Sequence, residues 1–187
     1  MRKFDLEKVI AGCKKKWSSD QEELYKHCFV TMIKVCLRYT TNMEEATGYY
    51  NAAMLKVFNN LEQYRSEGEF LAWVRRIVVN TSITHLKQKS RFEYKELDAL
   101  PENNYSSQPE IYSQLTAKEI MDVVQELPPN MKLVFNLSAL EGYTHEKIGE
   151  VLGISKGTSK WYLHEARKQL KEKIKALFNH EITSNAI

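Results

Sequence analysis

Apolar side chains recur three and four residues apart over most of this chain, which is the spacing of one face of an α-helix. Runs of alternating β-branched residues are missing, and glycine and proline number only seven and four. Three apolar stripes follow one another in the first part of the chain, at 25–37, 46–64 and 70–86. The pattern therefore predicts three helices in an all-α domain that ends near Arg91.

The periodic pattern stops between 92 and 116. This stretch holds two prolines, a run of Asn and Ser, and one Lys against five acidic residues. A structureless segment of this length inside one compact domain is unusual, so it reads as a flexible acidic linker. We expect an all-α fold of two small helical domains, at 1–91 and 117–187, joined by the linker 92–116.

After the linker, apolar periodicity predicts helices at 117–127 and 131–140. The next stretch, "GYTHEKIGEVLGISKGTSKWYLHEARKQL", has the layout of a helix-turn-helix. Thr144 and Ser155 are suited to cap the starts of its two helices. Gly153 suits the left-handed residue that ends the first helix, and Ile154 is expected to plug the turn. The second domain is therefore predicted to be a helix-turn-helix domain.

Projection at about 100° per residue gives the second helix of this motif a core face and a basic outer face. The core face holds Ser159, Leu163, Ala166, Leu170, Ile174 and Leu177. The outer face holds Gly157, Lys160, Trp161, His164, Lys168, Lys171 and Lys175. An amphipathic helix with a basic outer face is the form that reads a DNA major groove. The alternative is a solvated lysine face, and the charge alone does not separate the two.

Composition narrows the class of protein. The net charge is only +3, but residues 155–175 hold seven Lys or Arg against two Glu, and such a cluster suits a polyanionic partner. No apolar run approaches the roughly 20 residues that span a bilayer, and the charged N-terminal segment is unlike a secretory signal. The three cysteines have neither disulfide nor zinc spacing. We expect a cytoplasmic protein with no membrane insertion, no cofactor and no metal.

Two segments resemble the extracytoplasmic-function (ECF) group of the sigma-70 family, the bacterial RNA polymerase sigma factors. One is "FLAWVRRIVVNTSITHLKQKSR", similar to the family's F-x-x-W-[L/V]-x-x-I-x-x-N segment and the basic stretch after it. The other begins "LPPNMKLVFNLSALEGYTHEKIGEVLGISKG" and resembles the family's second domain almost without gaps. Both occur in the family's order, on either side of an acidic linker, and the resemblance covers about 23–174.

The resemblance implies partners and a role for each domain. The partners are core RNA polymerase and promoter DNA, both double-stranded and melted, and the family is often held inactive by an anti-sigma protein. The helix-turn-helix is implied to read the −35 element through Ser155, Lys156, Thr158, Lys160, Trp161, His164, Arg167 and Lys168. The first domain is implied to read and open the −10 element through Arg65, Phe70, Arg75, Arg76, Asn80, Thr84 and Lys87. Its helix at about 44–61 is implied to dock on the polymerase through Tyr50, Asn51, Met54 and Lys56.

This chain also departs from the family pattern. Where the polymerase-binding helix usually reads like D-L-V-Q-E-x-F, it reads "GYYNAAM", so the usual carboxylates are replaced. Gly48 in that helix interior costs up to about 1 kcal/mol relative to Ala. In the recognition helix, Ser159, Trp161, Tyr162 and Glu165 stand where Val, Ser, Arg and Arg are commoner. An atypical promoter sequence is the expected consequence.

Two other functions compete with the sigma-factor interpretation. The first is a stand-alone helix-turn-helix regulator that has lost polymerase binding, which "GYYNAAM" could suggest. The second is an enzyme, but the sequence holds no paired-carboxylate motif, phosphate-cradling loop or Cys/His nucleophile spacing. "THEKIG" has one His-Glu but lacks the second His of H-E-x-x-H. We therefore expect a protein that is not an enzyme.

The outer lysines give a first test. If Lys160 and Lys168 contact DNA phosphates, replacing either with Ala should reduce the slope of log affinity against log salt by about one, because fewer counterions are released on binding. Fluorescence anisotropy with duplex DNA over a range of salt concentrations measures this slope. An unchanged slope would mean that these lysines are only solvated.

Overall fold

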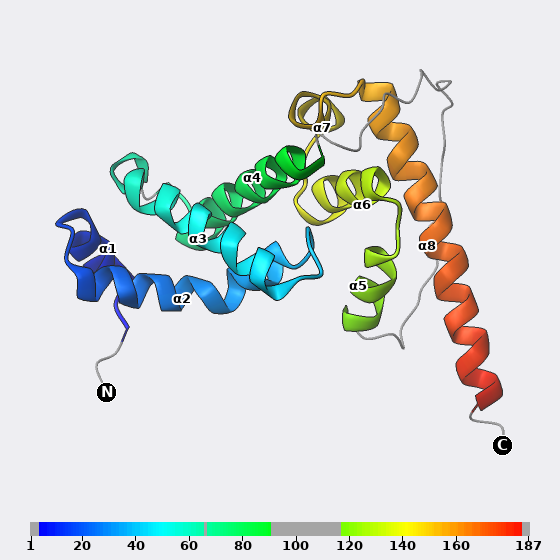
Figure 1. Cartoon of the computed structure of the whole chain (residues 1–187), viewed down its shortest axis with the longest axis horizontal. Helices are drawn as coiled ribbons and strands as arrows, with labels where there is room; N and C mark the ends of the chain where they lie inside the picture. The colour runs from blue at the N-terminus through cyan, green and yellow to red at the C-terminus, as the bar shows by residue number, and fades with distance from the viewer. Residues whose placement is uncertain (1–3, 66, 91–116, 185–187) are drawn as a thin grey trace. The chain divides into compact units, whose positions relative to one another are not determined.

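A computed structural model of the chain describes residues 4–65, 67–90 and 117–184. These residues fold into helices and connecting turns, in two compact units divided after Lys95 (Figure 1). Unit 1 contains α1 to α4 and unit 2 contains α5 to α8. The predicted all-α fold is confirmed, and the predicted linker 92–116 lies outside the described residues. Within the described ranges, no helix combines the length and the apolar character needed to cross a membrane.

In unit 1, the three predicted stripes are the helices α2 (Ser18–Cys36), α3 (Met43–Asn59) and α4 (Phe70–Ser90). They pack against one another pairwise, and their facing apolar residues form the core. Among the largest fully buried side chains there are Leu24, Met32, Tyr50, Met54, Phe70 and Val74. Asn42 caps α3 by accepting hydrogen bonds from the backbone N–H groups of Glu44 and Glu45.

Two elements of unit 1 were not predicted. The helix α1 (Leu6–Lys14) packs against α2, and the 3₁₀ turn η1 (Leu61–Gln63) follows α3. α1 is only nine residues long and buries Val9 and Cys13, so it spans too few turns to produce a clear period. Three helices were expected in this domain, and the described part of unit 1 contains four α-helices.

The three cysteines are buried and unbridged. Burial raises the pKa of Cys13 to about 11, that of Cys28 to about 12 and that of Cys36 to about 11. Cys28 and Cys36 therefore act as small buried hydrophobic residues.

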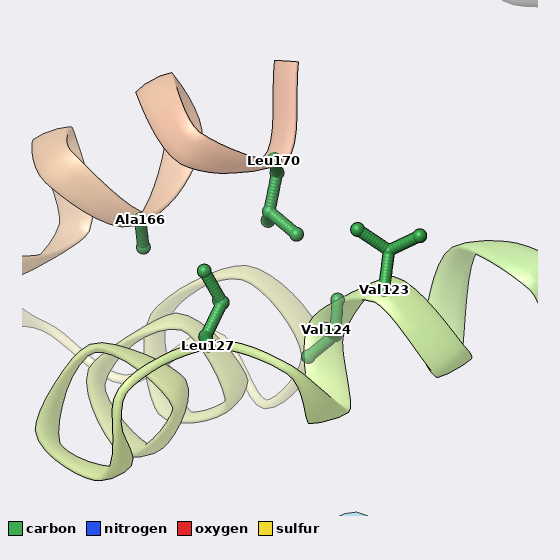
Figure 2. Close-up of a cluster of buried hydrophobic side chains, with 5 residues drawn as sticks. All are labelled: Val123, Val124, Leu127, Ala166 and Leu170. Carbon is green, nitrogen blue, oxygen red and sulfur yellow. The ribbon is translucent and has the colours of Figure 1, made fainter. Parts of the chain in front are cut away.

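In unit 2, α5 (Ala117–Gln125) and α6 (Pro129–Phe135) precede α7 (His145–Leu152) and the long α8 (Lys156–Ser184). The predicted helix at 131–140 is only partly regular, because Asn136–Leu140 form a π turn. α6 and α7 both pack against α8. Figure 2 shows α5 facing α8 across a cluster of Val123, Val124, Leu127, Ala166 and Leu170. This cluster holds α8 in place on the side away from its basic face.

Candidate nucleic-acid interface

The turn between α7 and α8 has the predicted helix-turn-helix geometry. Thr144 Oγ1 accepts a hydrogen bond from the Lys147 backbone N–H at 3.2 Å and so caps α7. Gly153 has φ 74°, in the left-handed region, and ends that helix. Ser155 Oγ accepts from the Thr158 backbone N–H at 2.9 Å and caps α8. The expected roles of these residues in the turn are confirmed.

Gly149 is a second glycine that this turn requires, and the sequence analysis missed it. A Cβ atom at this position would lie 2.7 Å from the Ile154 carbonyl oxygen, which is inside van der Waals contact. The chain folds back so closely because the Ile154 N–H donates to the Gly149 carbonyl at 3.1 Å. A glycine inside a helix does not by itself predict such a close approach, since Gly48 in α3 has open space around it.

Four of the six residues predicted for the inner face of α8 are buried, namely Ser159, Leu163, Ala166 and Leu170. Ile174 is half-buried, and the side chain of Leu177 lies outside the described part. Ser159 Oγ lies 2.9 Å from His145 Nδ1 at the start of α7, so its hydroxyl has a hydrogen-bond partner inside the core. The packing lost by having Ser in place of a larger apolar residue is offset by this link between the two helices.

Tyr162 also lies on the inner face of α8, although the helical projection did not assign it to that face. It is 5% exposed, and its hydroxyl accepts a hydrogen bond from the Asn130 side-chain amide at 3.3 Å. Trp161 was placed on the polar face and is half-buried, with its ring edge against Tyr162 at a centroid distance of 5.2 Å. Trp161 therefore partly covers the core and leaves part of its surface on the outer face.

The outer face of α8 is basic and accessible. The side chains exposed on it are those of Lys160, Arg167, Lys168, Lys171 and Lys175, and His164 is half-buried. Lys156 forms an ion pair with Glu146 of α7. Ser155 and Thr158 bond to each other at 2.8 Å between their hydroxyl oxygens. The eight residues expected to read the −35 element thus all lie on the first four turns of α8 or at its cap.

His145 reports the electrostatic potential at the start of α7. Its pKa lies below the ordinary histidine value, first because the ring is partly buried and next because Lys160 is near. Arg167 and Lys156 act in the same direction, and Glu146 acts against them. Cations from the first three turns of α8 therefore converge on the N-terminus of α7, which already favours anions. This is a suitable position for a DNA phosphate.

Unit 1 has an open depression between α3, η1 and α4. It is lined by Lys56, Asn60, Gln63, Trp73, Ile77, Asn80 and Thr81. Lys56 Nζ donates a hydrogen bond to Thr81 Oγ1 at 3.2 Å, so this side chain links α3 to α4. Trp73 packs on Tyr64 and Phe70, with ring centroids 5.4 and 5.7 Å away. The depression therefore combines an aromatic ring with amide and ammonium groups.

The structure distributes the expected −10 residues unevenly around this depression. Asn80 lines it, whereas Phe70 is 2% exposed and lies behind Trp73. The side chains of Arg65, Arg76, Thr84 and Lys87 are exposed elsewhere on the unit, and that of Arg75 is half-buried. Phe70 therefore has almost no surface for direct contact with DNA, and its ring packs against Trp73. Asn60, Gln63 and Thr81 were missed, since isolated amides and hydroxyls carry no sequence signal.

The expected polymerase-binding residues also divide into two groups. Tyr50 and Met54 are 0% and 1% exposed, and the Tyr50 hydroxyl donates to the Tyr25 backbone carbonyl at 2.6 Å. Neither has surface to offer a partner, so both are corrected to core residues. Asn51 is exposed and accepts a hydrogen bond from the Tyr25 hydroxyl at 2.7 Å. Leu55, which was not predicted, is 62% exposed on the same helix.

A helix-turn-helix with a basic outer face is the geometry found in proteins that read a DNA groove. Comparison with known families agrees: the model for sigma-70 region 2 matches residues 20–92, and the model for sigma-70 region 4 matches 117–170. The chain belongs to the ECF group of the sigma-70 family of RNA polymerase sigma factors.

Individual relatives are distant in sequence. The ECF RNA polymerase sigma factor SigE of Mycolicibacterium smegmatis is 23% identical over 81% of this chain, which spans 60% of the relative's length. The ECF RNA polymerase sigma-E factor of Haemophilus influenzae is 28% identical over 67% of this chain and 72% of its own. In fold, the chain is similar to the sigma factor RpoE of Bartonella quintana, solved with the anti-sigma factor NepR. The TM-score is 0.50 at 16% identity, over 83% of this chain and 97% of that one.

The two helical glycines at 48 and 149 should respond oppositely to alanine. Gly149→Ala forces the turn to move and should lower the free energy of unfolding of unit 2 by about 1–3 kcal/mol. Gly48→Ala meets open space on α3 and should raise that of unit 1 by up to about 1 kcal/mol. Native-state hydrogen exchange resolves the two units, and a stabilised Gly149→Ala variant would contradict the close approach.

His145 should make the stability of unit 2 depend on pH. The pKa of His145 is lower in the folded state than in the unfolded state. Below about pH 6.5, His145 is therefore protonated in the unfolded chain while it is still neutral in the folded chain. The free energy of unfolding should therefore fall as the pH drops from 7 through 6.5 towards the folded pKa. Urea unfolding across this range measures the slope, and His145→Asn should flatten it. An equal slope in both proteins would rule out this origin.

Proposed function

We propose that this sigma factor binds core RNA polymerase and directs it to promoters, with unit 2 reading the −35 element as duplex and unit 1 capturing the −10 element as it melts. The observation that carries the proposal is the presence of two different DNA-compatible surfaces in one chain. One is a basic recognition helix, and the other is an open aromatic and polar depression. They stand in the order of the two matched sigma-70 regions.

At the −35 element, the first turns of α8 are proposed to enter the major groove. Lys160, Trp161 and His164 lie towards the outer face, and lysine can donate to guanine O6 and N7. Arg167 and Lys168 lie farther along, where phosphate contacts set the register of the helix. The ion pair from Glu146 holds Lys156 at the edge of this surface. Lys156 is therefore proposed to contact the backbone rather than a base.

At the −10 element, the depression of unit 1 is proposed to receive a base that has left the duplex. Trp73 offers a ring face or edge for stacking, which contributes about 1–3 kcal/mol per base in single-strand binding sites. Asn80 offers an amide that can donate and accept at a base edge. Lys56 supplies positive charge beside them, so we assign it to DNA rather than to the polymerase. Arg65, Arg76 and Lys87 are proposed phosphate contacts.

Polymerase docking is proposed to use the outer face of α3. Gly48, Asn51 and Leu55 are exposed and uncharged on this face, and Glu44, one turn before Gly48, is an exposed carboxylate at its edge. A contact of this kind depends on apolar area and shape, whereas ionic contacts weaken as salt rises. Holoenzyme formation by this factor should therefore vary little with salt. The carboxylates missing from "GYYNAAM" then indicate a changed docking chemistry rather than lost docking.

The role proposed is that of an initiation factor without enzymatic activity of its own, acting in the cytoplasm where the polymerase and chromosome are. The Bartonella quintana factor was solved with an anti-sigma factor, and we include a protein of that kind among the proposed partners. A stand-alone helix-turn-helix regulator is not favoured, because the region 2 match spans the unit that such a regulator would not need.

Reconstitution tests the proposal. The purified chain should co-elute with bacterial core polymerase and support transcription from a promoter selected by the holoenzyme from a random DNA pool. Leu55→Asp should weaken the affinity for core polymerase by at least about 10-fold and so abolish co-elution, because the contact would bury an unpaired carboxylate. Lys160→Ala should keep co-elution and lose promoter binding. If the chain and core polymerase form no complex at micromolar concentration, the proposed sigma-factor function is wrong.

A further inference from the structure

The corner between α1 and α2 is a rigid basic turn that the proposed function does not use. It consists of Lys14, Lys15, Lys16 and Trp17. Backbone N–H groups of the last three residues donate to the Ala11, Cys13 and Gly12 carbonyls at 3.3, 2.9 and 3.1 Å. Because three hydrogen bonds fix this backbone, the side chains at the corner project from a defined base.

Local structure does not account for the residues found there. Lys16 has a φ of 60°, and no other non-glycine residue in the described part of the chain has a positive φ. Glycine takes that conformation without steric cost. Trp17 is the N-cap residue of α2 and makes no side-chain capping bond, where Ser, Thr, Asp or Asn would cap the helix. Lys16 and Trp17 are thus both residues that local stability disfavours at their positions. Residues of this kind are concentrated at functional sites.

The chemistry of the corner suits a polyanion with flat bases. Three consecutive lysines concentrate positive charge, and Lys15 Nζ lies 5.0 Å from the centroid of the Trp17 ring. The Trp17 side chain is 55% exposed, so much of its indole stays accessible beside the ammonium group. Basic side chains with an exposed aromatic ring are how proteins hold single-stranded nucleic acid independently of sequence.

The corner lies next to the depression of unit 1. α1 packs on η1, and Lys14 Nζ is 3.6 Å from the Glu62 carboxylate in η1. Asn60 and Gln63, on either side of this short turn, line the depression. A strand that leaves the depression over η1 therefore reaches the lysines and Trp17 on the same rigid unit.

We propose that the Lys14–Trp17 corner is a second contact for single-stranded DNA, at which Trp17 stacks on a base of the melted strand beyond the depression and Lys15 and Lys16 bind its phosphates. This inference rests on the proposed capture of the −10 element by unit 1. An acidic protein surface would also attract the lysines. The packing of α1 on η1, whose flanking residues line the depression, favours a nucleic acid strand over such a protein.

Binding of fluorescein-labelled oligodeoxythymidylates to the reconstituted holoenzyme tests the site. With a probe of about 16 nucleotides, Trp17→Ala should weaken binding about 10-fold, through loss of one stacked base. With a probe of about 4 nucleotides, which can fill only one of the two sites, the change should be much smaller. Lys15→Gln and Lys16→Gln should each reduce the salt slope by about 0.7. Lys34→Gln, at an exposed lysine elsewhere on α2, is the matched control and should leave the slope unchanged.

Two further variants separate binding from folding. Lys16→Gly places glycine at the positive φ, and Trp17→Asp places a capping residue at the start of α2. Each should raise the Tm by about 4 °C and weaken binding of the long probe. Unchanged binding of the long probe by Trp17→Ala, with normal binding by the unsubstituted holoenzyme, overturns the corner site alone. Loss of polymerase affinity in place of DNA affinity also overturns it and indicates a protein contact. Failure of the unsubstituted chain to form holoenzyme overturns both proposals.

Discussion

The close approach of the Ile154 carbonyl to Gly149 is the contact on which the DNA-reading unit depends. It brings the end of α7 against the start of α8 and fixes the angle between them. The bond between Ser159 and His145 and the ion pair between Lys156 and Glu146 then join the same two helices at other points. Because these contacts set the angle, the proposed DNA-binding face of α8 would not have to become ordered on binding.

Unit 1 separates support from contact in a different way. Phe70 and Tyr50 are buried and hold α2, α3 and α4 together, whereas Trp73 and Asn80 stand at the surface that this core shapes. Aromatic packing behind Trp73 limits the rotation of its ring, so a stacked base would meet a surface that is already ordered. On α3, the exposed Gly48, Asn51 and Leu55 are uncharged, whereas Glu44 and Lys56 towards its two ends are exposed and charged.

Much of the fold and part of the site follow from the sequence because they depend on neighbours along the chain. The caps at Thr144 and Ser155, the left-handed Gly153 and the inner face of α8 are all local features with a short-range cause. The Ser159–His145 bond, the burial of Tyr162 against Asn130 and the position of Lys56 over Thr81 join residues far apart in sequence, and no local pattern encodes them. Tyr50, Met54 and Phe70 were misassigned for the same reason: family position indicated a function, while only tertiary packing reveals that they have no surface. α1 was missed because a nine-residue helix spans too few turns.

The buried cysteines have a consequence for how this factor can be controlled. A thiol with a pKa near 11 is ionised in only about one molecule in ten thousand at neutral pH, and the thiolate is the form that oxidants attack. All three thiols of the chain are of this kind. Burial and a raised pKa together make all three thiols poor targets for oxidants, so thiol oxidation is not a route by which this factor is readily modified.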